Sequence, residues 1–297
     1  MSINAPDWFR PQYESRAMHI YQVKGNRLRS TVTQATSFND SNEAVFYLAG
    51  KTTAKKIDRH TTPAPGGGDR KKFTAPLSTW QAFDEVRQFD LDRLALPERE
   101  IIYESGAMAL GRATDNEIYA VAQAAKPSVE AGCDFSAGAF TAAQAMMLAR
   151  LVRQQTKGAS ADGRVYCGLP SDAFDQLLAN KPVYSADAVG SGHPAFNQPV
   201  ESRFWRGVHW FENIEEDEGD FFPVPEANKC DAFIWYQGAM GWGNKEELTM
   251  IPQWDNRMEG GGGWTINMQA KGGATTLQEG RGVIRFRLAT NANLAFV

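Results

Sequence analysis

Residues 45–84 restrict the fold more than any other part of the sequence, because two β-prone segments there flank a loop of proline and glycine. The first segment, 45–59, starts apolar and continues with mixed polarity, and the loop at 61–69 contains two prolines and three consecutive glycines. On the return, Phe73, Ala75 and Leu77 alternate as in a strand. The pattern predicts a long β-hairpin with a turn-rich tip.

Basic side chains surround the tip of this hairpin, at Lys51, Lys55, Lys56, Arg59, Arg70, Lys71 and Lys72. Charged side chains of this kind are almost never fully buried without a partner. We therefore expect the hairpin to project outward instead of packing within its own chain.

The basic hairpin belongs to a wider charge asymmetry. Residues 1–75 hold 12 Lys and Arg against 6 Asp and Glu, a net of +6, and the remainder holds 19 against 29, a net of −10, which together give −4. A basic quarter on an acidic body favours contact with another copy or with an anionic partner. A solvated basic arm is the alternative interpretation.

Residues 1–44 have little periodicity, are rich in Asn, Ser, Thr and Gln, and contain only isolated apolar residues. Such a segment has too little local apolar surface to fold by itself. Its aromatic residues, among them Trp8, Phe9 and Phe38, suggest that it docks on another surface. We predict an extended N-terminal arm, without the apolar region of a signal peptide.

A long helix is predicted over residues 97–125. Pro97 suits the first helical turn, and the acidic residues that follow suit the positive end of the helix dipole. At 1.5 Å per residue the helix would span about 43 Å, and Gly106 and Gly111 are its weak points. Spacings of three and four place these residues on one face: Tyr103, Ala107, Leu110, Thr114, Ile118, Val121 and Ala125.

The rest of the chain mixes helices and strands. Helices at 140–156 and 172–179 flank a strand at 164–169, which indicates an α/β portion. Alternating apolar residues predict strands around 248–250, 264–270 and 284–288. The glycine runs 260–263 and 272–273 are predicted as turns.

The overall composition is that of a globular protein, with 42% hydrophobic and 22% charged residues in a chain of 297. This length allows one large domain or two modest ones. No run approaches the ~18 apolar residues of a membrane span. Cys133, Cys167 and Cys230 are widely spaced, which argues against a disulfide framework or a zinc site and favours synthesis in a reducing compartment.

Motifs of catalysis and cofactor binding are absent from the sequence. The four histidines, at 19, 60, 193 and 209, lie in no zinc-protease pattern. The nearest approach to a nucleophile elbow has Val189 where that pattern needs glycine. The glycine runs lack the lysine-containing end of a phosphate loop. We therefore predict no catalytic residue, no cofactor site and no metal site.

Two denser clusters also favour structural interpretations. The acidic residues within 212–220 lack the spacing of an EF-hand loop, so a solvated loop is preferred to a calcium site. A platform for single-stranded nucleic acid needs aromatic residues interleaved with basic ones, and only Trp205, between Arg203 and Arg206, has them. Core or interface packing is the preferred role of the eight tryptophans.

The order of these elements resembles tailed-bacteriophage major capsid proteins with the Hong Kong 97-type fold. The resemblance covers nearly the whole chain and rests on architecture, with no single diagnostic motif. The segments that carry it resemble the extended loop and its return, the spine helix and its approach, the opening of the axial domain, a short aromatic strand, and the return to the peripheral domain: 51–59 and 70–90, 90–93 and 106–118, 164–178, 204–211, and 242–243 with the strands from 248 onward.

The resemblance implies an α+β fold of four parts. These are an N-terminal arm at 1–44, an extended loop at 45–84, a peripheral domain at 85–139 and 246–283 with the spine helix 97–125, and an axial domain at 140–245 and 284–297.

It further implies a structural protein without enzymatic activity. Copies would assemble as hexamers and pentamers into the icosahedral head of a tailed phage, with the arm and the extended loop on neighbouring subunits. The expected partners are other copies, a separate scaffolding protein, a portal, a decoration protein and packaged double-stranded DNA bound non-specifically, with no membrane. The protein would be made in the bacterial host cytoplasm and reside in the virion capsid.

Some relatives cross-link a loop lysine to an asparagine of a neighbour. Lys51, Lys55 and Lys56 are the candidate lysines here, but the sequence assigns no asparagine partner, so we do not expect the cross-link.

Three other hypotheses remain open at this point. An encapsulin-like bacterial nanocompartment shell would share the fold but enclose a protein cargo. A hydrolase would use His193, His209 and the acidic residues 212–220. A nucleic-acid-binding module would use residues 1–75, with salt-dependent affinity.

Overall fold

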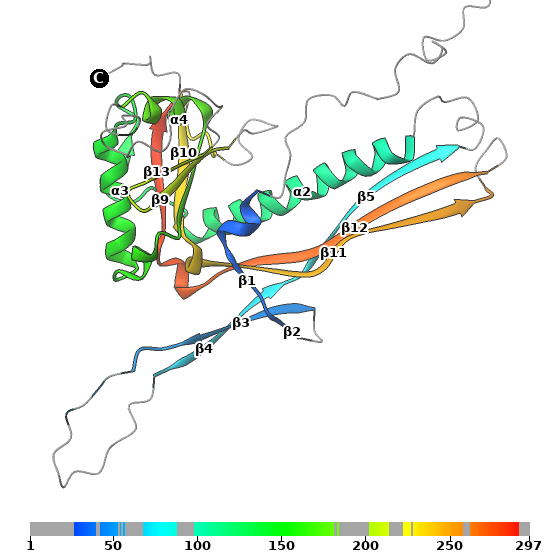
Figure 1. Ribbon diagram of the computed structural model, residues 1–297, viewed down its shortest axis with the longest axis horizontal. Helices are drawn as coiled ribbons and strands as arrows, with labels where there is room; N and C mark the ends of the chain where they lie inside the picture. Colours follow the sequence, from blue (N-terminus) through cyan, green and yellow to red (C-terminus); the bar gives the residue numbers. More distant parts are fainter. Residues whose placement is uncertain are drawn as a thin grey trace, which may run out of the picture.

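The computed structural model describes residues 27–39, 42–52, 54, 56, 68–87, 98–180, 183, 202–213, 222–226, 228–257 and 262–290. These residues form a compact body, a long tongue that extends to one side, and a hairpin that points in another direction (Figure 1). The predicted tip of the hairpin, His193 and all but the first residues of the acidic run fall outside the described residues.

Three sheets organise these parts. In the tongue the order is β1-β11-β12-β5, with bounds Thr33–Gln34, Met240–Asp255, Gly263–Thr276 and Ser78–Arg87. In the body the order is β6-β13-β10-β7-β9-β8, with bounds Asp134–Phe135, Val283–Ala289, Lys229–Tyr236, Val165–Leu169, Val208–Glu212 and Ser202–Trp205. The hairpin sheet is β2-β3-β4, with bounds Ser37–Asn39, Glu43–Ala49 and Arg70–Pro76.

Three α-helices accompany the sheets in the described parts of the chain: α2 (Glu98–Ala125), α3 (Ala142–Gln155) and α4 (Ser171–Leu178). Short 3-10 turns, η2 (Leu28–Thr31), η3 (Ala159–Asp162), η4 (Gln237–Ala239) and η5 (Gln278–Gly280), connect the elements. The predicted α+β class is confirmed, and the predicted long helix, both shorter helices and the strand between them lie within two residues of their expected bounds.

Helix α2 has 28 residues, which corresponds to about 42 Å, and it lies along the tongue sheet (Figure 1). Its predicted buried face is partly wrong. Tyr103 is 40% exposed, and Ile102 is buried in its place against Ile266 and Met268 of β12. The contact is centred on Gly106, where an added Cβ would collide with the Met268 side chain. A glycine at the closest approach carries no hydrophobic signal, so the apolar pattern misplaced the start of this face, whereas Leu110 and Ile118 farther along are buried.

The prediction of a turn at Gly272–Gly273 is also wrong, because both residues lie inside strand β12. Because each glycine has only a hydrogen atom in place of a side chain, another group can approach its backbone closely. A Cβ on Gly272 would meet the ring of Trp242, and one on Gly273 would meet the backbone carbonyl of Pro76. Gly273 therefore lets strand β12 pass against the base of the hairpin, and Gly272 leaves room for the Trp242 ring of β11.

The paired region of the hairpin differs from the expectation at its tip and on its return strand. Strand β3 ends at Ala49, and the described residues 50–52 are not in a strand. The pairing runs antiparallel from Glu43 opposite Pro76 to Ala49 opposite Arg70. Residues 78–84, which we expected in the hairpin, instead belong to β5 and pair with β12 of the tongue.

The core of the body lies on both faces of the six-stranded sheet. Helix α3 begins with a capping box, in which Thr141 and Gln144 bond each other's backbone N–H groups. Trp205, Trp210, Trp235 and Trp242 are all buried, as the packing interpretation predicted. All three cysteines are buried and free.

Candidate assembly surfaces

The described part of the predicted arm docks on its own chain. The carboxylate of Asp115 on α2 accepts hydrogen bonds from the backbone N–H groups of Arg27 and Leu28, at 3.1 and 3.0 Å. Trp235 donates to the carbonyl oxygen of Thr31 at 3.3 Å. Strand β1 then pairs in parallel with β11. Residues 27–34 are therefore part of the body, because Leu28 and Val32 fill its core.

The hairpin has a buried base and an exposed shaft. Ala44, Phe46, Ala75 and Leu277 form a small core at the base. Farther out, Tyr47 is 72% exposed, and the side chains of Arg70, Lys71 and Lys72 are exposed. Among the described residues, the one ion pair of the shaft joins Lys71 to Glu279 at 2.7 Å, and both side chains are more than half exposed. Such a pair contributes little, so the shaft has few interactions of its own that fix its position.

The tongue sheet has one covered face and one open face. Trp80, Ala82, Ile266 and Met268 belong to the face that packs against α2. On the other face Phe83 of β5 and Ile251 of β11 stand on either side of Asn267, in register across three strands. Phe83 is 55% exposed and Ile251 39% exposed. An apolar pair exposed on an otherwise polar sheet face suits contact with another surface.

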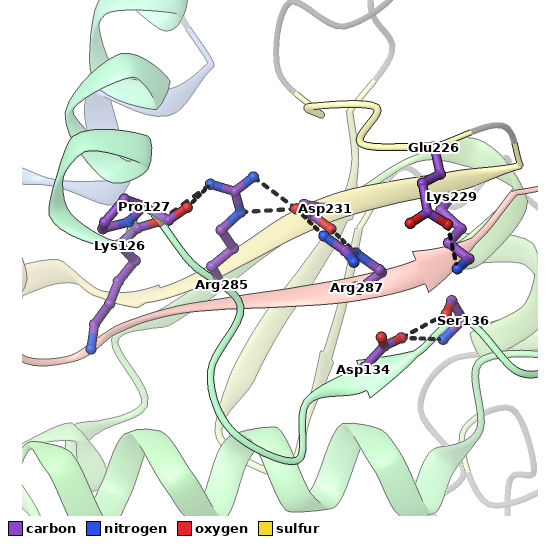
Figure 2. Close-up of polar contacts among 9 residues, drawn as sticks. All are labelled: Lys126, Pro127, Asp134, Ser136, Glu226, Lys229, Asp231, Arg285 and Arg287. Atoms are coloured by element: carbon purple, nitrogen blue, oxygen red, sulfur yellow. Dashed lines mark hydrogen bonds and ion pairs between the residues drawn. The ribbon is translucent and has the colours of Figure 1, made fainter.

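A buried carboxylate connects the body to the tongue. Asp231 of β10 is fully buried and accepts hydrogen bonds from both Arg285 and Arg287 of β13 (Figure 2). Arg285 also donates to the carbonyl oxygen of Pro127, just beyond the end of α2, at 2.7 Å. The carbonyl end of a helix carries partial negative charge, which the guanidinium neutralises. The long helix is thus attached to the body sheet at this end.

The smaller contacts around this cluster are more exposed. Ser136 donates to the carboxylate of Asp134 through both its backbone N–H and its hydroxyl, and these bonds lower the pKa of Asp134 (Figure 2). The Glu226 carboxylate, paired with Lys229 at 2.7 Å, likewise has a lowered pKa. Of these carboxylates, Asp231 is the buried one, and it holds Arg285 and Arg287 in position.

The residues of the hydrolase hypothesis do not assemble into a catalytic group among the described residues. The ring of His209 lies between Tyr166 at 5.1 Å and Phe204 at 4.5 Å. Burial lowers the pKa of His209 below its ordinary value. No set of three or more His, Cys, Asp or Glu side chains in the described parts is placed to hold a metal ion. His209 therefore serves as a packing residue in this geometry.

No helix in the described parts of the chain is both long enough and apolar enough to cross a membrane. The surfaces assembled above are suited to contacts between protein chains: a projecting hairpin, an open tongue face, and a body joined firmly to a long helix.

A sequence profile described as "Phage capsid protein" matches residues 5–289. The chain belongs to this phage capsid protein family. The match includes the arm, the hairpin, the tongue and the body, so the resemblance stated from the sequence is confirmed. No curated protein matches the chain.

Solved phage capsids have the same architecture. The capsid protein of Ralstonia phage GP4 superposes with a TM-score of 0.66 at 10% identity, covering 99% of this chain and 98% of that one. The capsid structure of cyanophage P-SCSP1u gives a TM-score of 0.66 at 14% identity, covering 97% and 94%. Cyanophage Pam1 gives 0.66 at 12% identity, covering 98% and 99%. The Hong Kong 97-type fold of this phage capsid protein is therefore shown, and an encapsulin is not favoured.

Proposed function

We propose that this chain is the major capsid protein that forms the icosahedral head of a tailed double-stranded DNA phage, assembling as hexamers and pentamers. One observation carries the proposal. A hairpin with a buried base and an exposed basic shaft leaves the body, in a chain that matches the phage capsid profile over residues 5–289.

The charge distribution supports self-association. The net charges of +6 in residues 1–75 and −10 in the remainder are complementary between copies. The hairpin and the open tongue face each offer a small contact. Many small contacts repeated around a closed shell give stable assembly without any single strong interface.

Electron microscopy of the purified full chain tests the proposal. We expect icosahedral particles, and a monodisperse monomer under all assembly conditions would overturn it. A matched variant replaces residues 51–68 by Asn-Gly, which closes β3 and β4 with a two-residue turn. We expect this variant to keep the thermal unfolding of the unassembled chain and to lose shells, because the paired strands β3 and β4 are left intact.

The contents of the particles separate the proposed head from a compartment shell. Packaged double-stranded DNA supports the phage head, whereas an enclosed protein cargo supports the encapsulin-like alternative. The proposal includes four partners besides other copies: a separate scaffolding protein, a portal, a decoration protein, and DNA held non-specifically. It also includes the division into arm, extended loop, peripheral domain and axial domain, with residues 78–84 moved from the extended loop to the tongue because β5 pairs with β12, no enzymatic activity, and synthesis in the host cytoplasm.

A further inference from the structure

The body sheet carries opposite charges at its two ends. Strands β7 and β9 are parallel, so both begin at one end of the sheet and both finish at the other. At the beginning, Arg153 near the end of α3 donates to the carbonyl oxygen of Arg206, which lies in the turn before β9. Both arginine side chains are exposed, and neither forms an ion pair with a described carboxylate.

A row of aromatic rings adjoins this basic end. Tyr166 of β7, His209 of β9 and Phe204 of β8 are opposite one another across three strands. The row runs from the covered part of the sheet to its edge, where Phe204 on the edge strand β8 is 54% exposed. Phe204 lies on the strand that leads into the turn with Arg206, so this end of the sheet has the aromatic and arginine composition of an interface centre.

The other end of β9 is acidic. Glu212 closes the strand, and Asp172 and Asp175 come from α4, which follows β7. Burial raises the pKa of Asp175, and the charges of Glu212 and Asp172 raise it further. Asp175 and Glu212 form no ion pair within the described residues. Carboxylates crowded in this way are stabilised by a positively charged partner.

The two charged ends cannot satisfy each other within one chain. Strand β9 has five residues, which at about 3.3 Å each separates its ends by about 16 Å. That distance exceeds the Debye length of about 8 Å at physiological ionic strength. The basic and acidic groups also lie at opposite ends of the same strand, so a complementary contact needs a second copy.

We propose that Arg153, Arg206 and Phe204 of one copy dock on Asp172, Asp175 and Glu212 of the next, and that this contact closes the rings of the capsid. The inference rests on the proposed function, and it names the surface by which body meets body. The contact is heterologous, because one patch meets a different patch. Heterologous contacts that repeat with a closing rotation generate rings.

Charge reversal tests the pairing with two variants. The first variant, Arg153→Glu with Arg206→Glu, places acidic side chains opposite the acidic patch of the next copy. The second, Asp175→Arg with Glu212→Arg, places basic side chains opposite the basic patch. We expect each alone to form rings with a yield reduced about tenfold or more, because like charges facing each other cost several kcal/mol. The chain that combines all four substitutions restores complementarity at the native net charge, and it should recover ring formation.

Mixing the two reversed variants gives a sharper result. Complementary contacts then occur only between unlike chains, so the two must alternate around a ring. Rings of six close with perfect alternation, whereas rings of five contain one mismatched contact. We expect native mass spectrometry of the co-expressed variants to show hexamers with three copies of each chain and a strong depletion of pentamers.

Failure of this contact and failure of the capsid role give different results. If the wild-type chain forms shells and both reversed variants form them equally well, the surface is wrong and the proposed function stands. If the wild-type chain forms neither rings nor shells, the proposed function itself is wrong. Unchanged circular dichroism and thermal unfolding of the unassembled variants show that the substitutions act at the surface. Hexamers and pentamers in equal proportion from the mixed variants would also overturn the head-to-tail pairing.

Discussion

One carboxylate oxygen of Asp231 accepts two hydrogen bonds from Arg285, from Nε at 3.0 Å and from Nη2 at 2.7 Å. Arg287 occupies the other oxygen at 2.7 Å. Asp231 is completely buried, while the two arginines retain partial exposure at their outer ends. The pair therefore joins strands β10 and β13 from inside the sheet and holds Arg285 against the end of α2.

Replacing the buried carboxylate should destabilise the fold strongly. We expect Asp231→Asn to lower the free energy of unfolding by about 3 kcal/mol, because removal of one partner leaves two guanidinium groups without a compensating charge. Asp134→Asn is the matched control, since Asp134 is exposed and accepts its hydrogen bonds from the neighbouring Ser136. Urea denaturation of the unassembled chain measures both, and equal effects would contradict the role given to Asp231.

The closest contact between α2 and the tongue predicts an unusual helix substitution. Gly106→Ala should raise helix propensity by up to about 1 kcal/mol, but its Cβ would displace the Met268 side chain. Overpacking costs about 1–3 kcal/mol, so we expect net destabilisation of about 1 kcal/mol. The double variant Gly106→Ala with Met268→Ala should lose less unfolding free energy than the two single variants lose in total. Strict additivity in this cycle would contradict the collision.

Two N-terminal deletions should differ in kind. Removal of residues 1–26 leaves Leu28 and Val32 in the core, so we expect an unassembled chain of near-native thermal stability. Removal of 1–44 deletes both core residues and the strands β1 and β2, and we expect a large fall in melting temperature together with loss of shells. Differential scanning fluorimetry compares them, and equal melting temperatures would show that the docking of 27–34 contributes nothing.

The buried thiols predict alkaline sensitivity. Burial, with a smaller contribution from the Glu130 carboxylate, raises the pKa of Cys133 to about 11. The unfolded chain loses this proton near pH 9 while the folded chain retains it, so stability falls as pH rises from about 9 to 11. From pH 9 to pH 11, we expect the free energy of unfolding of Cys133→Ala to fall by about 2 kcal/mol less than that of the wild-type chain. Parallel pH profiles of the two proteins, measured by urea denaturation, would contradict this.

The sequence predicted the long helix, the α/β body and the projecting hairpin, because each has a strong period or a dense turn signal. It failed where glycine packs. Gly106 and Gly272 make close contacts through the absence of a side chain, and no hydrophobic pattern records such contacts. It also assigned residues 78–84 to the hairpin, since alternation alone does not reveal that β5 pairs with β12.

The candidate surfaces were harder to predict than the fold. The exposed arginines Arg153 and Arg206 are 53 residues apart in the sequence, and the packing of α3 on the body sheet brings them together. The expectation that residues 1–44 dock on a partner surface is confirmed for residues 27–34. For residues 27–34 that partner is the chain's own α2, β10 and β11, which the local sequence does not reveal.

The hydrogen bond between Trp235 and Thr31 joins residues separated by 204 positions. During synthesis, residues 27–34 therefore cannot pack in their final position until most of the chain has left the ribosome. Strand β3 likewise has its base against glycines of β11. A chain that ended before β10 and β11 would lack the surfaces on which residues 27–34 and the base of the hairpin pack.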